Sequence, residues 1–392
     1  MNTAPLASVV IVNYNYARFL GAAIDSGLAQ SWPNVEVIVV DDGSTDDSRR
    51  IINTYGSRIH PIFKSNGGQA SAANVGFAAA AGDVVILLDA DDALLSDALS
   101  HVVPLFDDPT VSHVHWPMWQ IDAAGQRNGK QFPSSPLPHG DLRDAVIAGG
   151  PDVFFSPPCS GNAWSGRFVR KVMPMPRDGL FGRHAEMYLV TLSPIFGTVR
   201  RLPKPQSCYR IHGGNDWVTK SQAERDQRAR SLYAERCQVL QQTLANLGIN
   251  ADPQRWMHGS WWGRVDRFRA ELARVVPPGE SLALIDQDQL RNDVQNDWQV
   301  RPFPEHEGQY WGPPADDAEA LAELERHRRQ GSRYLAVAWP ALWWLQHYRG
   351  LREHLSGECR CLLESDVLIV FDIGEQRASS QHASRPASAV AS

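Results

Sequence analysis

The sequence has little that suits a disulfide framework, a membrane span or a nucleic-acid surface. Its five cysteines are an odd number, scattered along 392 residues, which predicts reduced thiols in a cytoplasm. No stretch approaches the roughly 18 consecutive apolar residues of a membrane-spanning helix, so we expect no transmembrane segment and, at most, peripheral membrane contact. The formal net charge of -6, without a basic stripe, argues against nucleic acid as a partner.

Two common nucleotide-binding fingerprints are also missing. The chain contains no G-x-x-x-x-G-K, and no G-x-G-x-x-G follows its first apolar run, which weakens NTPase and dinucleotide-binding interpretations. Cys359 and Cys361 form a C-x-C without the second pair that a zinc site usually needs. With 43% hydrophobic and 21% charged residues, the composition is that of a soluble globular protein. The length favours two domains.

Apolar runs alternate with helical periodicity through the first hundred residues. The runs predict buried strands, and the segments between them predict helices, so this part is α/β with a mainly parallel sheet covered on both faces. Ser44, with Asp47 three residues later, is expected to cap a helix. The predicted strands are 8–13, 35–40, 60–64 and 84–88, and the clearest predicted helix is 69–81. From about 111 to 212 shorter strands predict a mixed edge to the same sheet.

The remaining chain divides by composition and periodicity. Long helical patterns cover 219–247 and 254–276, and Pro277-Pro278-Gly279 marks a boundary. A second α/β unit follows, with strands expected at 281–285, 334–339 and 367–373 and helices at 316–329 and 341–355. We therefore predict a first domain over 1–218, a helical connector over 219–276, a smaller α/β domain over 277–373 and a disordered tail over 374–392.

Polar residues follow three of the predicted strands. In open parallel sheets, ligands bind beyond the carboxyl ends of the strands, although polar strand ends also serve solubility alone. The residues at these ends are Asn13, Tyr14 and Asn15, then Asp41 and Asp42, then Asp89, Asp91 and Asp92.

Each of these strand ends has two interpretations. Asp89-Ala90-Asp91 suits a divalent cation such as Mn²⁺ or Mg²⁺, which prefers oxygen ligands, or it is a solvated turn that caps the next helix. The carboxylates at 41–46 suit the imide N–H of a pyrimidine or a helix cap. Asn66–Ala70 either brings backbone close to an anionic ligand or is an ordinary loop.

The motifs taken together resemble glycosyltransferase family 2, whose fold is GT-A. The resemblance rests on Val-Asn-Tyr-Asn (12–15), Val-Val-Asp-Asp-Gly-Ser-Thr-Asp (39–46), Gly-Gly-Gln-Ala-Ser-Ala-Ala-Asn-Val-Gly (67–76) and Leu-Leu-Asp-Ala-Asp-Asp (87–92), in that order and spacing. It continues through Ser160-Gly-Asn-Ala-Trp164 and Tyr209-Arg-Ile-His-Gly-Gly-Asn215. It covers about residues 6–216.

The resemblance implies a role for each matching residue. Asp41 and Asp42, with Asn13, hold the nucleobase and ribose, and Asp91 binds the metal that bridges the diphosphate. Asp89 contacts the nucleoside and helps to fix the metal shell. His212 stands where some members supply a further metal ligand or diphosphate contact. The other residues implied in nucleotide-sugar binding are Asn15, Gly67, Gln69, Asn74 and Ala90.

Glu186 stands where the family usually has an aspartate acting as general base. It is one methylene longer, and without the resemblance it would be interpreted as a surface acid on an amphipathic helix. His212 likewise has the alternative of a structural histidine. Many members carry arginine where this chain has Ala73, so that donor contact is absent. The second α/β unit resembles a Rossmann-like module found at the C-termini of some bacterial glycosyltransferases, and its tryptophan-rich helix is interpreted as core, with acceptor binding as the alternative.

The activity implied is that of a metal-dependent, inverting hexosyltransferase. The donor would be a nucleoside-diphosphate sugar, with UDP preferred, and the acceptor a hydroxyl on a glycan, a lipid-linked molecule or a protein. The setting implied is bacterial polysaccharide or glycoconjugate synthesis in the cytoplasm or at the inner face of the plasma membrane. Two other functions stay open at this point: a nucleotidyltransferase, and a non-catalytic scaffold that binds nucleotide sugars.

Overall fold

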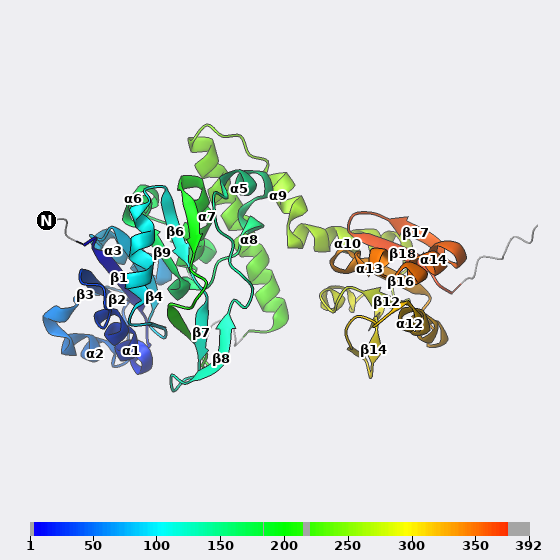
Figure 1. Ribbon diagram of the computed structural model, residues 1–392, viewed down its shortest axis with the longest axis horizontal. Coiled ribbons are helices and arrows are strands. Elements are labelled where there is room, and N and C mark those ends of the chain that lie inside the picture. The colour runs from blue at the N-terminus through cyan, green and yellow to red at the C-terminus, as the bar shows by residue number, and fades with distance from the viewer. Residues whose placement is uncertain (1–3, 183, 215–219, 375–392) are drawn as a thin grey trace, which may run out of the picture. The chain divides into compact units, whose positions relative to one another are not determined.

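The computed structural model describes residues 4–182, 184–214 and 220–374. The chain divides into two compact units between Met257 and His258 (Figure 1). Apart from Gly374, the tail expected to be disordered lies outside the described residues, as does Thr219, where the long connector helix was expected to begin.

The first unit is built on two sheets. Its strands are β1 (Ala7–Asn13), β2 (Val35–Asp41), β3 (His60–Phe63), β4 (Val84–Asp89), β5 (Ala93–Leu94), β6 (Val111–His115), β7 (Met118–Ile121), β8 (Arg127–Phe132), β9 (Asn162–Ser165), β10 (Thr198–Arg201) and β11 (Ser207–Arg210). Its helices are α1 (Ala17–Leu28), α2 (Ser48–Thr54), α3 (Gln69–Ala79), α4 (Ala98–Val102), α5 (Arg143–Gly149), α6 (Gly166–Val172), α7 (Ala185–Phe196), α8 (Gln222–Asn246) and α9 (Pro253–Gly259).

The larger sheet has seven strands in the order β10-β6-β9-β4-β1-β2-β3, and only β9 runs antiparallel to its neighbours β4 and β6. Val9 and Ile11 face a core formed with α1, α2 and α4, while Val10 faces α3. Because both faces are covered, the strand reads as one continuous apolar run. The expected mixed, mainly parallel α/β sheet is confirmed.

The second sheet, ordered β5-β11-β7-β8, holds the segment after Asp89. β5 begins four residues after that aspartate and pairs antiparallel with β11, so the segment that precedes His212 lies next to the acidic strand end. This pairing brings together residues that are more than a hundred positions apart in the chain.

The cap expected at Ser44 is wrong. Helix α2 begins at Ser48 with Asp47 as its N-cap residue. The Ser44 hydroxyl instead accepts hydrogen bonds from the Asn13 amide, at 3.0 Å, and from the Asn15 backbone N–H, at 2.9 Å. The serine therefore connects two strand ends.

Alanine substitutions at two helix glycines of this unit are expected to change its stability in opposite directions. A Cβ added to Gly76 in α3 would lie 2.3 Å from Val10 Cγ1, whereas one added to Gly21 in α1 would meet only Tyr55 Oη, at 3.5 Å. We expect Gly76→Ala to destabilise the unit by about 1–3 kcal/mol through overpacking. Gly21→Ala should stabilise it by up to about 1 kcal/mol through helix propensity. Chemical denaturation of the full chain measures both, and equal effects would contradict this packing.

The second unit contains a five-stranded sheet, ordered β13-β12-β16-β18-β17. Its elements are α10 (Trp261–Val275), β12 (Ser281–Ile285), α11 (Arg291–Val294), β13 (Gln299–Pro302), β14 (Glu305–His306), β15 (Gln309–Tyr310), α12 (Asp317–Arg329), β16 (Tyr334–Ala338), α13 (Trp344–His347), α14 (Arg349–Glu358), β17 (Arg360–Glu364) and β18 (Leu368–Asp372). β13, β12 and β16 are parallel, whereas β18 is antiparallel to β16 and β17. Helices α10 and α11 cover one face, and α12, α13 and α14 cover the other.

Two expected helices are interrupted. The helical pattern over 254–276 is divided at Ser260, whose side chain caps α10 by accepting from the Gly263 N–H at 3.0 Å. The pattern over 341–355 is divided at Tyr348, between α13 and α14. Trp344 is fully buried, as expected for a core residue, but Trp343 is 41% exposed. Periodicity alone did not reveal these breaks because apolar residues continue across them.

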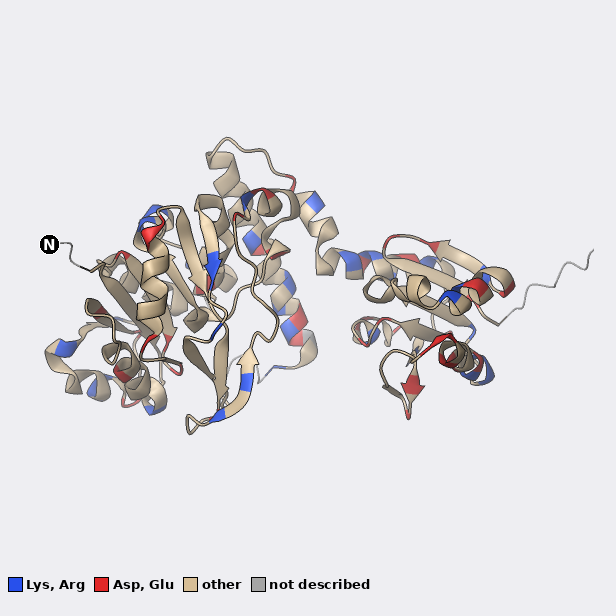
Figure 2. Ribbon diagram, in the orientation of Figure 1, with Lys and Arg blue, Asp and Glu red and all other residues tan. Residues whose placement is uncertain are grey.

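Acidic and basic residues are interspersed along α8 and α12 (Figure 2). Among the described residues, no helix is both long enough and apolar enough to cross a membrane.

Candidate active site

Three predicted positions meet at the carboxyl edge of the larger sheet. In the β1–β2 pair Asn13 is opposite Asp41, and in the β1–β4 pair Val12 is opposite Asp89. The parallel register therefore places all three strand ends at one level. Asn13 and Asp41 are fully buried, and the Asn13 amide donates to Asp41 Oδ1 at 2.8 Å.

Asn15 shapes the loop beyond β1. It has the left-handed φ of 61° that asparagine tolerates better than most residues. Its side-chain oxygen accepts from the Thr45 N–H at 2.8 Å. The structure thus places Asn15 against the loop after β2, and donor contact by its side chain stays a prediction.

Asp42 holds the glycine loop. It is 2% exposed, and its carboxylate accepts from the backbone N–H groups of Gly67, at 3.0 Å, and Gly68, at 2.8 Å. The Lys64 ammonium group forms an ion pair with the same carboxylate. A Cβ at Gly67 would lie 2.7 Å from Ser71 Oγ, so a larger residue there would require the Ser71 side chain to move. Asp42 therefore acts on the loop, whereas the resemblance gave it a nucleobase contact.

Gln69 connects the acidic strand end to the helix that carries Glu186. Its amide donates to Asp89 Oδ1 at 3.2 Å, and its oxygen accepts from the Ala185 N–H at 3.5 Å. Asn74, five residues further along α3, contacts another segment. Both ends of its side chain bind the backbone of Met175, at 2.9 Å each. The structure brings Gln69 into the site and leaves Asn74 outside it.

Carboxylates gather around the end of β4. Burial, then the neighbouring charges of Asp91 and Glu186, raises the pKa of Asp89 well above its ordinary value. Burial, then Asp91 and Asp89, does the same to the pKa of Asp92. Ala90, which follows Asp89, is 4% exposed and belongs to the hydrophobic core, and donor contact by Ala90 stays a prediction. The raised pKa values of Asp89 and Asp92 show that negative charge at this strand end is disfavoured by burial and by the neighbouring carboxylates.

Glu186 belongs to this cluster. It lies in the first turn of α7 and is only 7% exposed, so it is not the surface acid of the alternative interpretation. Burial raises its pKa to about 7, opposed by a backbone hydrogen bond and by the charges of Arg236 and Arg228 on α8. A carboxyl group with a pKa near neutrality is suited to exchange protons.

Helix α8 contacts both α7, which carries Glu186, and the turn that precedes it. Glu235 accepts from the Leu180 N–H at 2.7 Å, which holds the turn that leads into α7. Arg236 donates to Thr191 Oγ1 of α7 at 2.8 Å and to the Pro151 carbonyl at 2.6 Å. Sequence reasoning missed both residues because they lie outside the matching motifs on what looks like a polar helix.

Arg210, the last residue of β11, and His212, two residues later, contact the acidic cluster. His212 Nε2 lies 3.0 Å from Asp91 Oδ2, and its ring packs 4.8 Å from the Phe19 ring. The Arg210 backbone N–H donates to Asp92 Oδ1 at 2.9 Å, and its side-chain Nε donates to the Asp91 carbonyl at 2.7 Å. Arg210 stood inside a matching motif, yet its role could not be read from the sequence.

The donor set fits a hard divalent cation. Asp91 and His212 offer an oxygen and a nitrogen 3.0 Å apart, and the crowded carboxylates would be relieved by positive charge. Within the described residues, no three His, Cys, Asp or Glu side chains form a complete ligand group. Mg²⁺ and Mn²⁺ sites in nucleotide enzymes commonly use one or two protein ligands and fill the rest with phosphate oxygens and water.

Comparison with known proteins decides the family. The profile of "Glycosyl transferase family 2" matches residues 8–161. An uncharacterized glycosyltransferase of Nostoc sp. is 36% identical over 229 residues, which cover 57% of this chain and 70% of the relative. The chain belongs to glycosyltransferase family 2. It is therefore a glycosyltransferase with the GT-A fold, as the motifs predicted.

Other relatives match over shorter stretches. A Pasteurella multocida hyaluronan synthase is 35% identical over 139 residues, which cover 34% of this chain and 14% of the synthase. An uncharacterized glycosyltransferase of Rickettsia prowazekii is 38% identical over 104 residues, and the chain covers 33% of its length.

Solved structures match at low identity. A structure of S. aureus TarS 1-349 in complex with UDP-GlcNAc has a TM-score of 0.45 at 15% identity, covering 83% of this chain and 92% of that fragment. The mannosyltransferase PcManGT of Pyrobaculum calidifontis, in complex with GDP-Man and Mn²⁺, has a TM-score of 0.44 at 17% identity, covering 66% of this chain and 69% of that one.

Proposed function

We propose that this family 2 glycosyltransferase moves a sugar from a nucleoside-diphosphate donor, preferably a UDP-sugar, to an acceptor hydroxyl with inversion at the anomeric carbon. The observation that carries the proposal is the burial of Glu186 near Asp89, whose pKa its charge raises. Burial raises the pKa of Glu186 to about 7, at the carboxyl edge where the donor is expected.

Glu186 is proposed as the general base. As the acceptor oxygen attacks the anomeric carbon, the carboxylate takes the proton of that hydroxyl, and the bond to the diphosphate breaks on the opposite face. The first turn of a helix favours the negative form of the group before transfer. The surrounding low-polarity environment favours the neutral form after it. Arg236 and Glu235 keep the helix in place.

Asp91 and His212 are proposed to hold Mn²⁺ or Mg²⁺, with Asp89 in the surrounding shell. Bound there, the ion would supply Lewis-acid stabilisation of the charge on the departing diphosphate. Arg210 positions the Asp91–Asp92 turn through its contacts with both residues. Gln69 connects Asp89 to the start of α7 through a hydrogen bond to each.

The stereochemistry of donor turnover tests this proposal. The purified chain, incubated with Mn²⁺ and UDP-sugars, is expected to release UDP slowly by transferring the sugar to water. For an α-linked donor, proton NMR should first detect the β-anomer of the free sugar. First appearance of the α-anomer would contradict inversion. Failure to turn over UDP-, dTDP- or GDP-sugars would contradict the donor class.

Substitutions of Asp41 and Asp42 are expected to have different kinetic effects. Asp41 lies beside Asn13 in the predicted nucleobase pocket, so Asp41→Asn should reduce the preference for UDP- over GDP-sugars. Asp42 holds Gly67 and Gly68, so Asp42→Asn should raise KM for every donor by a similar factor, about tenfold for the loss of one charge-assisted contact. Ratios of kcat/KM between donors measure the difference. A change of base preference in Asp42→Asn alone would reverse the assignment.

A further inference from the structure

The sheet of the second unit has an edge where ligands characteristically bind. From β12 the chain passes to β13 on one side and then to β16 on the other, and these strands are parallel. The order therefore reverses between β12 and β16, and in such sheets ligands lie beyond the carboxyl ends of the strands at this point. β12 leads there into Asp286, and β16 into Trp339.

The loop after β12 is held in a strained shape. Asp286 is 1% exposed, and its carboxylate accepts from the N–H groups of Asp288, at 2.9 Å, and Leu290, at 2.6 Å. Gln287 and Asp288 both have a left-handed φ of 58°, a conformation that costs free energy and persists when its surroundings enforce it. The result is an exposed Asp288 carboxylate in a defined position at the edge.

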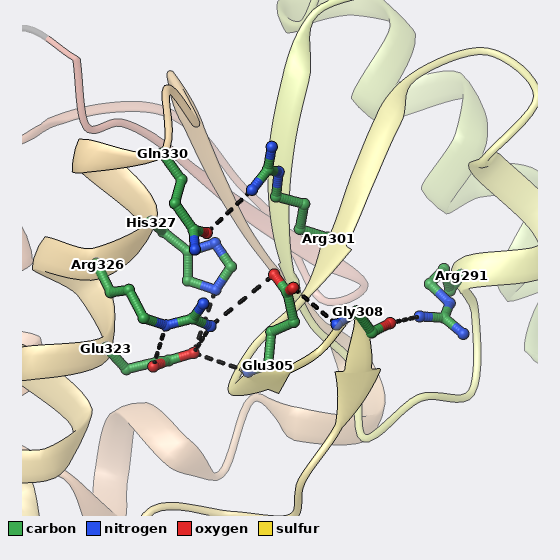
Figure 3. Close-up of polar contacts among 8 residues, drawn as sticks. All are labelled: Arg291, Arg301, Glu305, Gly308, Glu323, Arg326, His327 and Gln330. Atoms are coloured by element: carbon green, nitrogen blue, oxygen red, sulfur yellow. Dashed lines mark hydrogen bonds and ion pairs between the residues drawn. The ribbon is translucent and has the colours of Figure 1, made fainter.

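A short hairpin, β14–β15, is fixed beside this loop (Figure 3). Arg291 donates to the Gly308 carbonyl at 3.0 Å and lies 3.6 Å from Asp288. At the base of the hairpin, the Glu305 N–H donates to Glu323 of α12 at 2.7 Å, and Arg326 donates to the same Glu323 carboxylate at 2.8 Å. These contacts fasten the hairpin to both the loop and the helix.

The fastened segments carry exposed aromatic rings. In the described part of the second unit, the exposed large hydrophobic side chains are Trp261, Trp311 and Trp343, at 37%, 75% and 41%. Trp311 directly follows β15, and its ring lies 5.2 Å from that of His306. Trp343 lies five residues after the end of β16, and its ring centroid is 6.4 Å from that of Tyr348.

Tyr310 and Tyr348 connect these aromatic segments to the acidic loop. Burial, then the charges of Asp286, Tyr348 and Asp288, raises the pKa of Tyr310. The Tyr348 hydroxyl donates to the Pro314 carbonyl at 2.6 Å, which holds the chain just after Trp311. Aromatic rings and carboxylates therefore share one edge of the sheet.

We propose that this edge binds a neutral saccharide, with Trp311 and Trp343 packing on the apolar faces of sugar rings and Asp288 accepting hydrogen bonds from sugar hydroxyls. The C–H groups on a sugar face suit the electron-rich face of an indole. Arg291 lies 3.6 Å from Asp288 and offsets its charge, which suits an uncharged ligand, and an exposed, rigidly mounted tryptophan is a common binding hot spot. Identifying this saccharide as part of the acceptor glycan rests on the proposed function.

Calorimetric titration of the full chain with three neutral oligosaccharides, cellohexaose, maltohexaose and chitohexaose, tests the site. We expect at least one of them to bind, and Trp311→Ala and Trp343→Ala each to weaken binding by about tenfold, the loss of one good contact. Leu247→Ala is the control, because Leu247 is 42% exposed, as much as Trp343, but lies at the end of α8 in the first unit. It should leave the affinity within about twofold.

Three results would overturn the saccharide site: no binding of any of the three probes, equal weakening by Leu247→Ala, or unchanged binding by the double variant of Trp311 and Trp343. Donor hydrolysis, measured separately, is expected to stay at the wild-type rate in Trp311→Ala. A chain that binds oligosaccharide but never hydrolyses a nucleotide sugar keeps the saccharide site and contradicts the transferase proposal instead.

Discussion

Replacing Glu186 with glutamine is expected to lower turnover by about 10²- to 10⁴-fold, the usual contribution of a general base, while the donor KM stays within about twofold. Glutamine keeps the size of the side chain but cannot accept the proton. The kinetics of sugar transfer or donor hydrolysis measure the effect. Asp144→Asn is a suitable control, because Asp144 is an acid in the first turn of α5 but is exposed.

The same variant should remove a pH dependence. Because burial raises the pKa of Glu186 to about 7, the wild-type kcat/KM should fall about tenfold per pH unit below that value and level off above it. Glu186→Gln should lose this acid limb. The limb persisting in Glu186→Gln, or turnover unaffected by the substitution, would place the base elsewhere.

Stability separates this catalytic effect from misfolding. The folded-state pKa of Glu186 is above its ordinary 4.5, so the protonated carboxyl is the form that the fold favours. Ionisation therefore costs stability increasingly as the pH rises from about 4.5 to about 7. At pH 8, Glu186→Gln should unfold at the wild-type temperature or above it. Early unfolding would attribute the lost activity to structure.

Asp91→Asn is expected to reduce metal-dependent turnover by at least about 100-fold, since Lewis-acid stabilisation by a bound ion contributes several kcal/mol. The amide keeps one oxygen but loses the charge that pairs with the cation. It also weakens the contact with His212 Nε2, which lies 3.0 Å from Asp91. Turnover as a function of Mn²⁺ concentration should show a raised half-saturation value as well as a lower maximum.

Asp107→Asn provides the comparison for charge removal, because Asp107 is exposed at the end of the short turn after α4. It should leave both the rate and the metal response unchanged. Wild-type enzyme that retains full activity in EDTA would exclude a metal from the reaction. Normal metal response in Asp91→Asn would move the metal site to another group.

The strand ends could be predicted because their signals are local. The apolar run of β1 and the residues that follow β2 and β4 are contiguous in sequence, and a parallel sheet brings such ends to one edge. Asn13, Asp41 and Asp89 therefore lie where the pattern placed them. The same local reasoning failed at Ser44, because a capping pattern does not reveal that the hydroxyl is already bound by Asn13 and Asn15.

Contacts between distant segments could not be predicted in this way. His212 reaches Asp91 only because β11 pairs with β5, a pairing between residues more than a hundred positions apart. Glu235 and Arg236 act on α7 through packing between helices, and their polar surroundings in the sequence are typical of any solvated helix face. Neither periodicity nor motif spacing carries that information.

By itself, the sequence determined the alternation of strands and helices, the order of the acidic strand ends and the family to which the chain belongs. Only the tertiary structure decided that Glu186 is buried near Asp89, that Asp42 holds the glycine loop and that the hairpin before the exposed Trp311 is fixed to α12. The physical reason is that the residue pattern of a strand or a helix is a property of residues close together in the sequence. Desolvation and charge crowding, which set the chemistry of a carboxyl group, depend on which distant segments pack around it.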